Sequence, residues 1–126
     1  MKLTPGDILS IFCPIAGYDK YHVCVYVGLD GDAHKFLFLN SDPNFSDTLA
    51  VPCAEIPCLP ESDTGYSVFS FSILPRYNDR QLLLYKAKLL GRLDTAVAQK
   101  AKAAAENSRS FTKQERLIVV AALESI

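Results

Sequence analysis

A histidine and a lysine lie two positions apart at the start of a segment in which apolar residues alternate with other types. His22 follows Lys20, and residues 23–27 have the period of a strand. An imidazole titrates near neutral pH, so His22 is a candidate for proton transfer, with Lys20 beside it to hold negative charge. Arg76 and Arg80 lie in a later turn, and their guanidinium groups suit a phosphate, because each can contact two oxygens. These residue types favour acid–base chemistry on a phosphate ester.

Four further side chains are candidates for substrate contacts. Ser41 ends an apolar segment and Ser72 lies within an alternating one, so their hydroxyls could donate hydrogen bonds from strand ends. Tyr18 and Tyr21 precede or open the segment that carries the histidine, where an aromatic ring could stack on an unpaired base. The catalytic hypothesis therefore combines four catalytic and four substrate-binding residues.

Each of these residues also has a structural interpretation. A histidine at the start of a strand is commonly a hydrogen-bonded structural residue, and tyrosines are commonly edge-of-core residues. Arg76 and Arg80 flank Asp79 and could form a solvated turn with a weak surface ion pair. His34 lies in a polar turn, and we expect it to have neither a partner nor a catalytic role.

Length and composition indicate one globular domain. The chain has 126 residues, of which 49% are hydrophobic and 21% charged, so it can bury a core without disulfides or metals. Its 13 basic and 14 acidic residues give a formal net charge of −1. A global basic surface for nucleic acid or anionic lipid is therefore excluded, and any RNA-binding surface must be local.

The cysteines and the N-terminal residues predict a cytoplasmic protein without a cofactor. Cys53 and Cys58 are five positions apart, which is not the spacing of a zinc ribbon, so we expect buried thiols and no metal site. Residues 1–7 lack the apolar centre of a signal peptide, and no apolar run has the length of a membrane span. We therefore expect no membrane partner and a reducing compartment.

The pattern of apolar residues and turn formers predicts strands first and helices last. Expected strands cover residues 8–13, 20–28, 36–41, 48–51, 66–74 and 84–90, with a loop over residues 53–67 and a meander of the first three strands. Asp94 caps an alanine-rich helix to about residue 107, and Thr112 with Glu115 forms a capping box for a last helix. The fold class is mainly β, a small SH3-like barrel over residues 1–91 followed by two helices over residues 94–126.

Several short motifs in this order resemble the PemK and MazF toxins: Gly6-Asp7-Ile8, Asn40-Ser41, Ser72-Ile73-Leu74 and Gly91-Arg92-Leu93-Asp94. The resemblance implies a barrel of the CcdB, PemK and MazF kind that forms a homodimer. It implies metal-independent cleavage of single-stranded RNA, by attack of the 2′-hydroxyl on the adjacent phosphate, and restraint by an antitoxin protein. The loop cation of the family falls on Lys20 or His22, the polar exit of the third strand on Ser41, and the later arginine on Arg76 or Arg80.

Two other classes of function remain open. The family usually carries an Arg-Pro pair where this chain has Lys20-Tyr21-His22, which favours a catalytically inactive barrel that binds protein or RNA. His22-Val23-Cys24-Val25-Tyr26-Val27-Gly28 also resembles the histidine strand of NlpC-type papain-like cysteine peptidases. That mechanism needs a cysteine at the N-terminus of a helix, and no expected helix begins with one.

Overall fold

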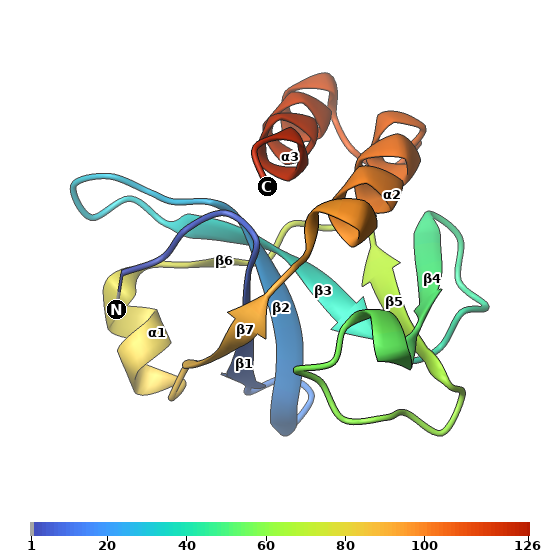
Figure 1. Ribbon diagram of the computed structural model, residues 1–126. Helices are drawn as coiled ribbons and strands as arrows, with labels where there is room; N and C mark the ends of the chain where they lie inside the picture. The colour runs from blue at the N-terminus through green and yellow to red at the C-terminus, as the bar shows by residue number, and fades with distance from the viewer. Residues whose placement is uncertain (1) are drawn as a thin grey trace.

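An antiparallel sheet of seven strands forms the centre of the protein (Figure 1), and the computed structural model describes residues 2–126. The strands are β1 (Asp7–Cys13), β2 (Tyr18–Tyr26), β3 (His34–Asn40), β4 (Thr48–Pro52), β5 (Tyr66–Ser70), β6 (Arg76–Tyr77) and β7 (Lys88–Arg92). Their order in the sheet is β4-β5-β3-β2-β1-β7, and β6 pairs with β3. The predicted meander of the first three strands is confirmed, since β2 pairs with both β1 and β3.

The mainly β fold with C-terminal helices is confirmed, whereas closure into a barrel is not. The path of paired strands starts at β4 and ends at β7, and in residues 2–126 no ladder joins these two strands. A barrel requires such a ladder, because closure is what removes the edges of a sheet. The SH3-like identity therefore remains a prediction, and the sheet keeps two edges.

Both predicted C-terminal helices are present, and their starts are fixed by capping side chains. Helix α2 spans Thr95–Glu106, and the Asp94 side chain accepts a hydrogen bond from the N–H of Val97 at 2.8 Å. Helix α3 spans Lys113–Glu124, and its capping box pairs Thr112 with Glu115 in both directions. These local contacts satisfy N–H groups that have no partner within the helix.

The sequence prediction was only partly correct between residues 66 and 92. Strand β5 ends at Ser70 and not at residue 74, and α1 (Asp79–Leu84) forms a helix where a turn had been expected. The strand expected over residues 84–90 is present as β7, which starts at Lys88 and ends at Arg92. Asn78 and Gln81 form a capping box that starts α1. A further short 3₁₀ helix, η1 (Cys53–Glu55), opens the expected loop. Leu82, Leu83 and Leu84 are adjacent in a helix of only six residues. A run this short shows no helical period, so the sequence pattern does not distinguish it from a strand.

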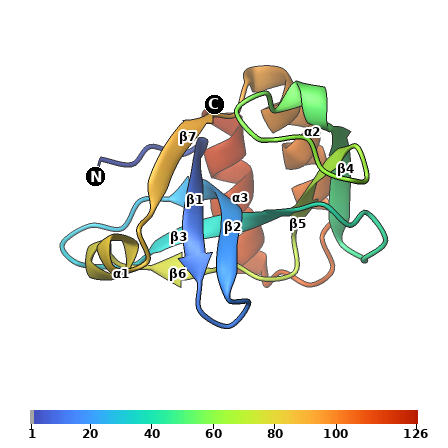
Figure 2. The same ribbon diagram turned by 90° about the horizontal axis from the view of Figure 1, so that it is seen from below.

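Both faces of the central strands are buried. On one face, Val23 of β2 and Leu37 of β3 pack with α2 and α3, where buried alanines such as Ala98 and Ala101 allow the helix to approach the sheet. On the other face, Cys24 and Phe36 pack with a second cluster that includes Leu82 of α1. Figure 2 shows α2 and α3 behind the sheet and α1 at its side. Polar chemistry is consequently confined to the strand ends and edges.

No helix in residues 2–126 is long and apolar enough to cross a bilayer. The longest helices, α2 and α3, have 12 residues each, whereas a membrane span needs about 20. This agrees with the expectation that the described part of the chain lacks a helical membrane span.

Helix α1 ends in a Schellman motif with an unusual residue at its turn. The N–H of Lys86 donates to the Leu83 carbonyl at 3.2 Å, and the N–H of Ala87 donates to the Leu82 carbonyl at 2.9 Å. This geometry places Lys86 at a φ of 54°, the left-handed region that glycine adopts without strain. A lysine at this position therefore lowers the stability of the fold.

We predict that Lys86→Gly raises the free energy of unfolding by about 0.5–1 kcal/mol. Glycine removes the backbone strain of a left-handed residue, and this gain exceeds the entropy that glycine adds to the unfolded chain. The measurement is urea unfolding at equilibrium. Lys88→Gly is the matched control, since Lys88 lies in extended strand β7 and glycine is expected to lower stability there. A decrease for both variants would contradict this account of the turn.

Candidate functional site

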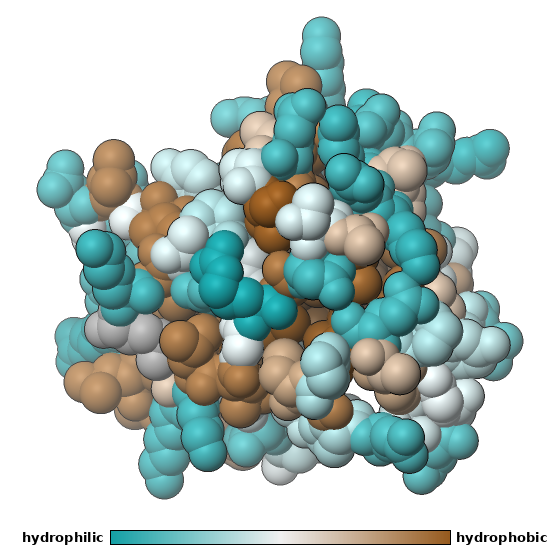
Figure 3. Space-filling view, in the orientation of Figure 1, coloured by the Kyte–Doolittle hydropathy of each residue, from teal (hydrophilic) through white to brown (hydrophobic). Residues whose placement is uncertain are grey.

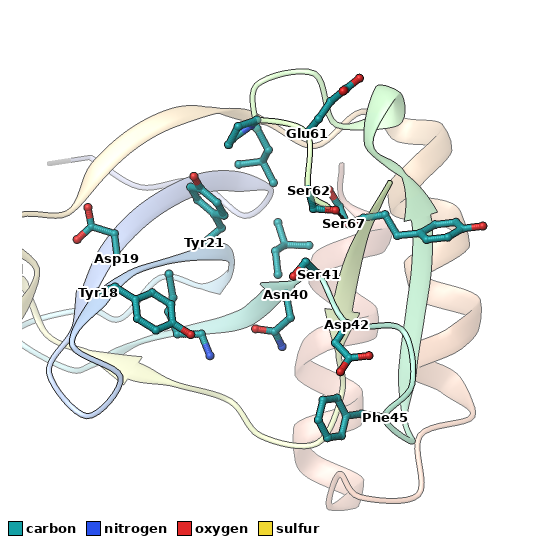
Figure 4. Close-up of a pocket in the computed structure, with 15 residues that line it drawn as sticks. Tyr18, Asp19, Tyr21, Asn40, Ser41, Asp42, Phe45, Glu61, Ser62 and Ser67 are labelled. Carbon is teal, nitrogen blue, oxygen red and sulfur yellow. Dashed lines mark hydrogen bonds between the residues drawn. The ribbon is translucent and has the colours of Figure 1, made fainter. Parts of the chain in front are cut away.

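A cavity of about 470 Å³ opens at one end of the sheet (Figure 4). Its walls come from the start of β2, the exit of β3, the loop that follows β3, residues 59–62 and the start of β5. These segments are far apart in sequence and meet because β2, β3 and β5 are neighbours in the sheet. The pocket is therefore built from strand ends held by a buried core.

The pocket brings together half of the residues proposed from sequence. Tyr18, Lys20, Tyr21 and Ser41 line it. His22, Ser72, Arg76 and Arg80 are not among its lining residues. The proposed substrate-contacting positions near the start of β2 and the exit of β3 thus share one cavity, whereas the proposed proton-transfer and phosphate-binding groups lie elsewhere.

The charges around the pocket are mainly negative. Asp19, Asp42 and Glu61 supply three carboxyl groups, against one ammonium group from Lys20. The Lys20 ammonium also lies 4.4 Å from the ring centroid of Phe38, close enough for a cation–π contact. The lining therefore has formal charges of three minus against one plus, and the single cation already has a favourable contact.

Hydroxyl hydrogen bonds hold the outer wall of the pocket in place. The Thr64 hydroxyl donates to the Ser41 carbonyl at 2.6 Å, which ties the loop before β5 to the exit of β3. The Ser62 hydroxyl donates to the Tyr66 carbonyl at 2.7 Å. Because backbone carbonyls accept these bonds, the wall is formed without a ligand.

A buried thiol supports the same wall from behind. The N–H of Ser62 donates to the sulfur of Cys53 at 3.5 Å, and the Ser62 hydroxyl lies 3.6 Å from that sulfur. The backbone N–H and then the hydroxyl of Ser62 lower the pKa of the Cys53 thiol, because both stabilise the thiolate. Cys53 and Cys24 are buried, as expected, whereas Cys13 and Cys58 are only partly buried. Cys53 contacts the loop that shapes the pocket.

His22 lies in the interior of the second core face and not at an open site. Its Nδ1 atom is 3.0 Å from the Lys20 carbonyl, which can only accept, so Nδ1 carries the proton. Nε2 is then the acceptor facing the Tyr77 hydroxyl at 3.4 Å. The rings of Phe36 and Phe38 complete its surroundings. Burial lowers the pKa of His22 to about 4, so the imidazole is neutral near pH 7.

The arginine and serine candidates lie on exposed parts of the second half of the chain. Arg76 is in β6 opposite Lys35 of β3, and Arg80 is an exposed residue of α1. The Ser72 hydroxyl is 2.9 Å from the Ser70 hydroxyl. Since His22 contacts Tyr77 and the side chains of successive strand residues alternate, Arg76 points away from the imidazole. The geometry thus gives no support to a cooperating histidine and arginine.

The expectation that His34 lacks a partner was wrong. His34 is buried at the start of β3, and its Nδ1 accepts a hydrogen bond from the N–H of Gly28 at 2.9 Å. The other ring nitrogen therefore carries the proton and donates it to the Asp79 carboxylate at 2.7 Å. Both nitrogens are occupied, so this histidine–aspartate pair fastens α1 to the sheet and leaves no free proton acceptor. The partners are 45 residues apart, and no local pattern could have paired them.

The arrangement needed for a cysteine peptidase is not formed in residues 2–126. The contacts of His22 are with the Lys20 carbonyl and with aromatic side chains. Cys53 opens only the three-residue η1 and contacts Ser62. Such a peptidase requires a thiolate beside an imidazole, and these two groups have different partners here.

Comparison with known proteins adds no family to this description. A scan against protein-family models and a search of curated proteins both found no match. The carboxyl groups of the pocket were missed from sequence because Asp19, Asp42 and Glu61 lie in separate polar loops that no spacing connects.

The buried state of His22 predicts a dependence of stability on pH. Its pKa falls from 6.5 to about 4 on folding, so the unfolded chain takes up a proton that the native chain does not. Above about pH 6.5 the neutral His22 contributes fully to stability. As the pH falls from 6.5 toward 4, this contribution is lost, and the free energy of unfolding decreases by about 3 kcal/mol.

Chemical unfolding between pH 7 and pH 4 measures this effect. The control is His22→Leu, which has no titrating group at the position and should lose less stability over that interval than the wild type. Equal pH slopes for the two proteins would show that His22 titrates normally in the folded state.

Proposed function

We propose that the chain is a non-catalytic binding module and that its pocket receives a cationic segment of a partner protein. The observation that carries this proposal is the composition of the pocket lining, which includes three carboxyl-bearing residues and one lysine. A guanidinium or ammonium group of a partner would gain from these carboxylates, whereas an anion would be repelled.

Exposed aromatic rings at the pocket also suit a cationic ligand. Tyr18 is 60% exposed and Phe45 is 68% exposed, so both rings are accessible from solvent. In the view of Figure 4, they lie on the lower side of the pocket, with Asn40 and Ser41 near its middle. An aromatic face attracts a cation, and an amide or hydroxyl group can hydrogen-bond the backbone of a bound segment.

A phosphate backbone fits this lining less well than a basic peptide does. Proteins that bind single-stranded nucleic acid use a positively charged groove together with stacking rings. The rings are present here, but the lining has no arginine, and its only lysine is Lys20. The charges favour protein over RNA as the ligand.

The second candidate is the metal-independent endoribonuclease of a type II toxin–antitoxin system. It is favoured by one observation: Lys20 and Ser41, which the PemK and MazF resemblance assigns to the loop cation and the strand exit, line the same pocket. An SH3-like barrel, a homodimer and an antitoxin partner belong to this candidate. It needs a proton acceptor other than His22, because that imidazole is buried outside the pocket.

Binding of a short synthetic peptide tests the first candidate. We predict that an acetylated hexapeptide with two arginines binds in fluorescence titrations and that its glutamate counterpart does not. Replacing Asp42 and Glu61 together by Asn and Gln should weaken binding by about tenfold, because two attractive charges are lost. Glu106→Gln is the matched control at the exposed end of α2 and should bind as the wild type does. Equal affinity of the double variant and the control would contradict the proposal.

Incubation with single-stranded RNA in the presence of a chelator separates the two candidates. We predict no cleavage above the background of a heat-denatured sample, because His22, the residue expected to transfer the proton, does not line the pocket. Cleavage that persists in His22→Phe and is lost in both Lys20→Ala and Ser41→Ala would instead establish the nuclease. Loss of cleavage in His22→Phe, with cleavage retained in Lys20→Ala and Ser41→Ala, would assign the catalytic role to the buried imidazole.

A further inference from the structure

We propose that the open edge of β7, with the leucines beside it, binds an extended acidic and apolar segment of a partner protein as an added strand. This surface consists of Leu83 and Leu84 of α1, Lys86 of the turn, and Lys88 and Leu89 of β7. It is separate from the pocket, whose lining includes none of these residues.

Strand β7 is an end of the sheet. It pairs with β1 on one side, and no strand in residues 2–126 pairs with its other side. An edge strand presents backbone N–H and carbonyl groups that an extended chain can pair with. β7 has five residues, so it offers an edge of about 17 Å, enough for a segment of similar length.

Leucines cover the surface next to this edge. Leu83 is 83% exposed, Leu84 is 67% exposed and Leu89 is 50% exposed. In Figure 3, apolar surface gathers at the lower left, the region where Figure 1 places α1 and the start of β7. Leucines this exposed, in α1 and in the open strand that follows it, mark an interaction surface better than single exposed leucines do.

The charges on the same surface are positive. Lys86 and Lys88 are exposed, as is Arg80 in the preceding helix α1, and in the described part of the chain none of the three lies within 4 Å of a carboxylate. The nearby Asp79 carboxylate is held by His34. Lys86 also occupies the left-handed position at the end of α1, where glycine would be less strained. Acidic side chains would complement this rim.

A second copy of the chain fits this edge poorly. Antiparallel pairing of two β7 strands about Leu90 would place Lys88 opposite Arg92 of the other copy. Like charges directly opposite each other destabilise a strand pair. A hetero-partner with carboxylates avoids this repulsion, which is why we assign the edge to an acidic segment.

The two faces of β7 determine the pattern of the ligand. Leu89 pairs with Leu9, which belongs to the core on the α1 side, whereas Lys88 pairs with Ser10 and points to the other side. An added strand should therefore alternate, with apolar side chains toward Leu89 and α1 and acidic side chains toward Lys88. This period-two pattern separates the ligand from the basic peptide assigned to the pocket.

The probe is an acetylated and amidated hexapeptide of alternating leucine and glutamate, added to the isotope-labelled protein in NMR amide-exchange measurements. We expect the amide exchange of β7 to slow by about tenfold at saturation, since strand pairing protects backbone N–H groups. Lys88→Glu and Leu89→Glu should each weaken binding by about tenfold. The matched controls are Lys113→Glu and Leu117→Glu, at exposed positions of α3, and should leave it unchanged.

Several results would overturn the assignment. One is binding with unchanged exchange in β7, and another is equal weakening by the variants in β7 and in α3. A dimer of the free chain that Leu89→Glu dissociates would assign the edge to a second copy. Leu89→Ala serves as a second variant, and its thermal unfolding verifies that the sheet is intact. The arginine peptide that binds the pocket should not compete with the leucine–glutamate peptide for the β7 edge. The proposals for the pocket and for the edge are therefore tested independently.

Discussion

The burial of both faces of β1, β2 and β3 is the constraint on which the rest of the structure depends. Helices α2 and α3 cover one face, and α1 with the aromatic residues around Tyr77 covers the other. Any polar group in the middle of these strands must find a partner inside the protein, because water is excluded. His22 does so with the Lys20 carbonyl and the Tyr77 hydroxyl, and burial lowers its pKa to about 4, so the ring remains neutral.

The two proposed binding surfaces consequently lie at strand ends and at an edge of the sheet. At the start of β2 and the exit of β3, the strand ends and the neighbouring loops bring Asp19, Asp42 and Glu61 around a cavity. At one end of the strand order, β7 has an edge that no strand of residues 2–126 pairs with, and exposed leucines lie in α1 and in β7 itself. The two surfaces have opposite charge, so they are suited to different segments of partner proteins.

Local features of the fold were predictable from sequence, and long-range features were not. The helix starts at Asp94 and Thr112 depend on contacts three residues away, and the central strands depend on alternation. Helix α1 was missed because its polar first residues were assigned to a turn and its last residue, Leu84, to the following strand. The pairing of His34 with Asp79 and the gathering of carboxylates around the pocket depend on tertiary packing, which residue spacing does not encode. His22 was assigned to chemistry because a sequence does not show that both faces of its strand are covered.

The most direct test of this account is an NMR titration of the His22 ring nitrogens. The account predicts a neutral imidazole at pH 5.5, protonated on Nδ1, because the pKa is lowered to about 4 and the Lys20 carbonyl accepts from that atom. An imidazole that gains its second proton near pH 6.5 would contradict it, because such a ring would be open to solvent and available for catalysis.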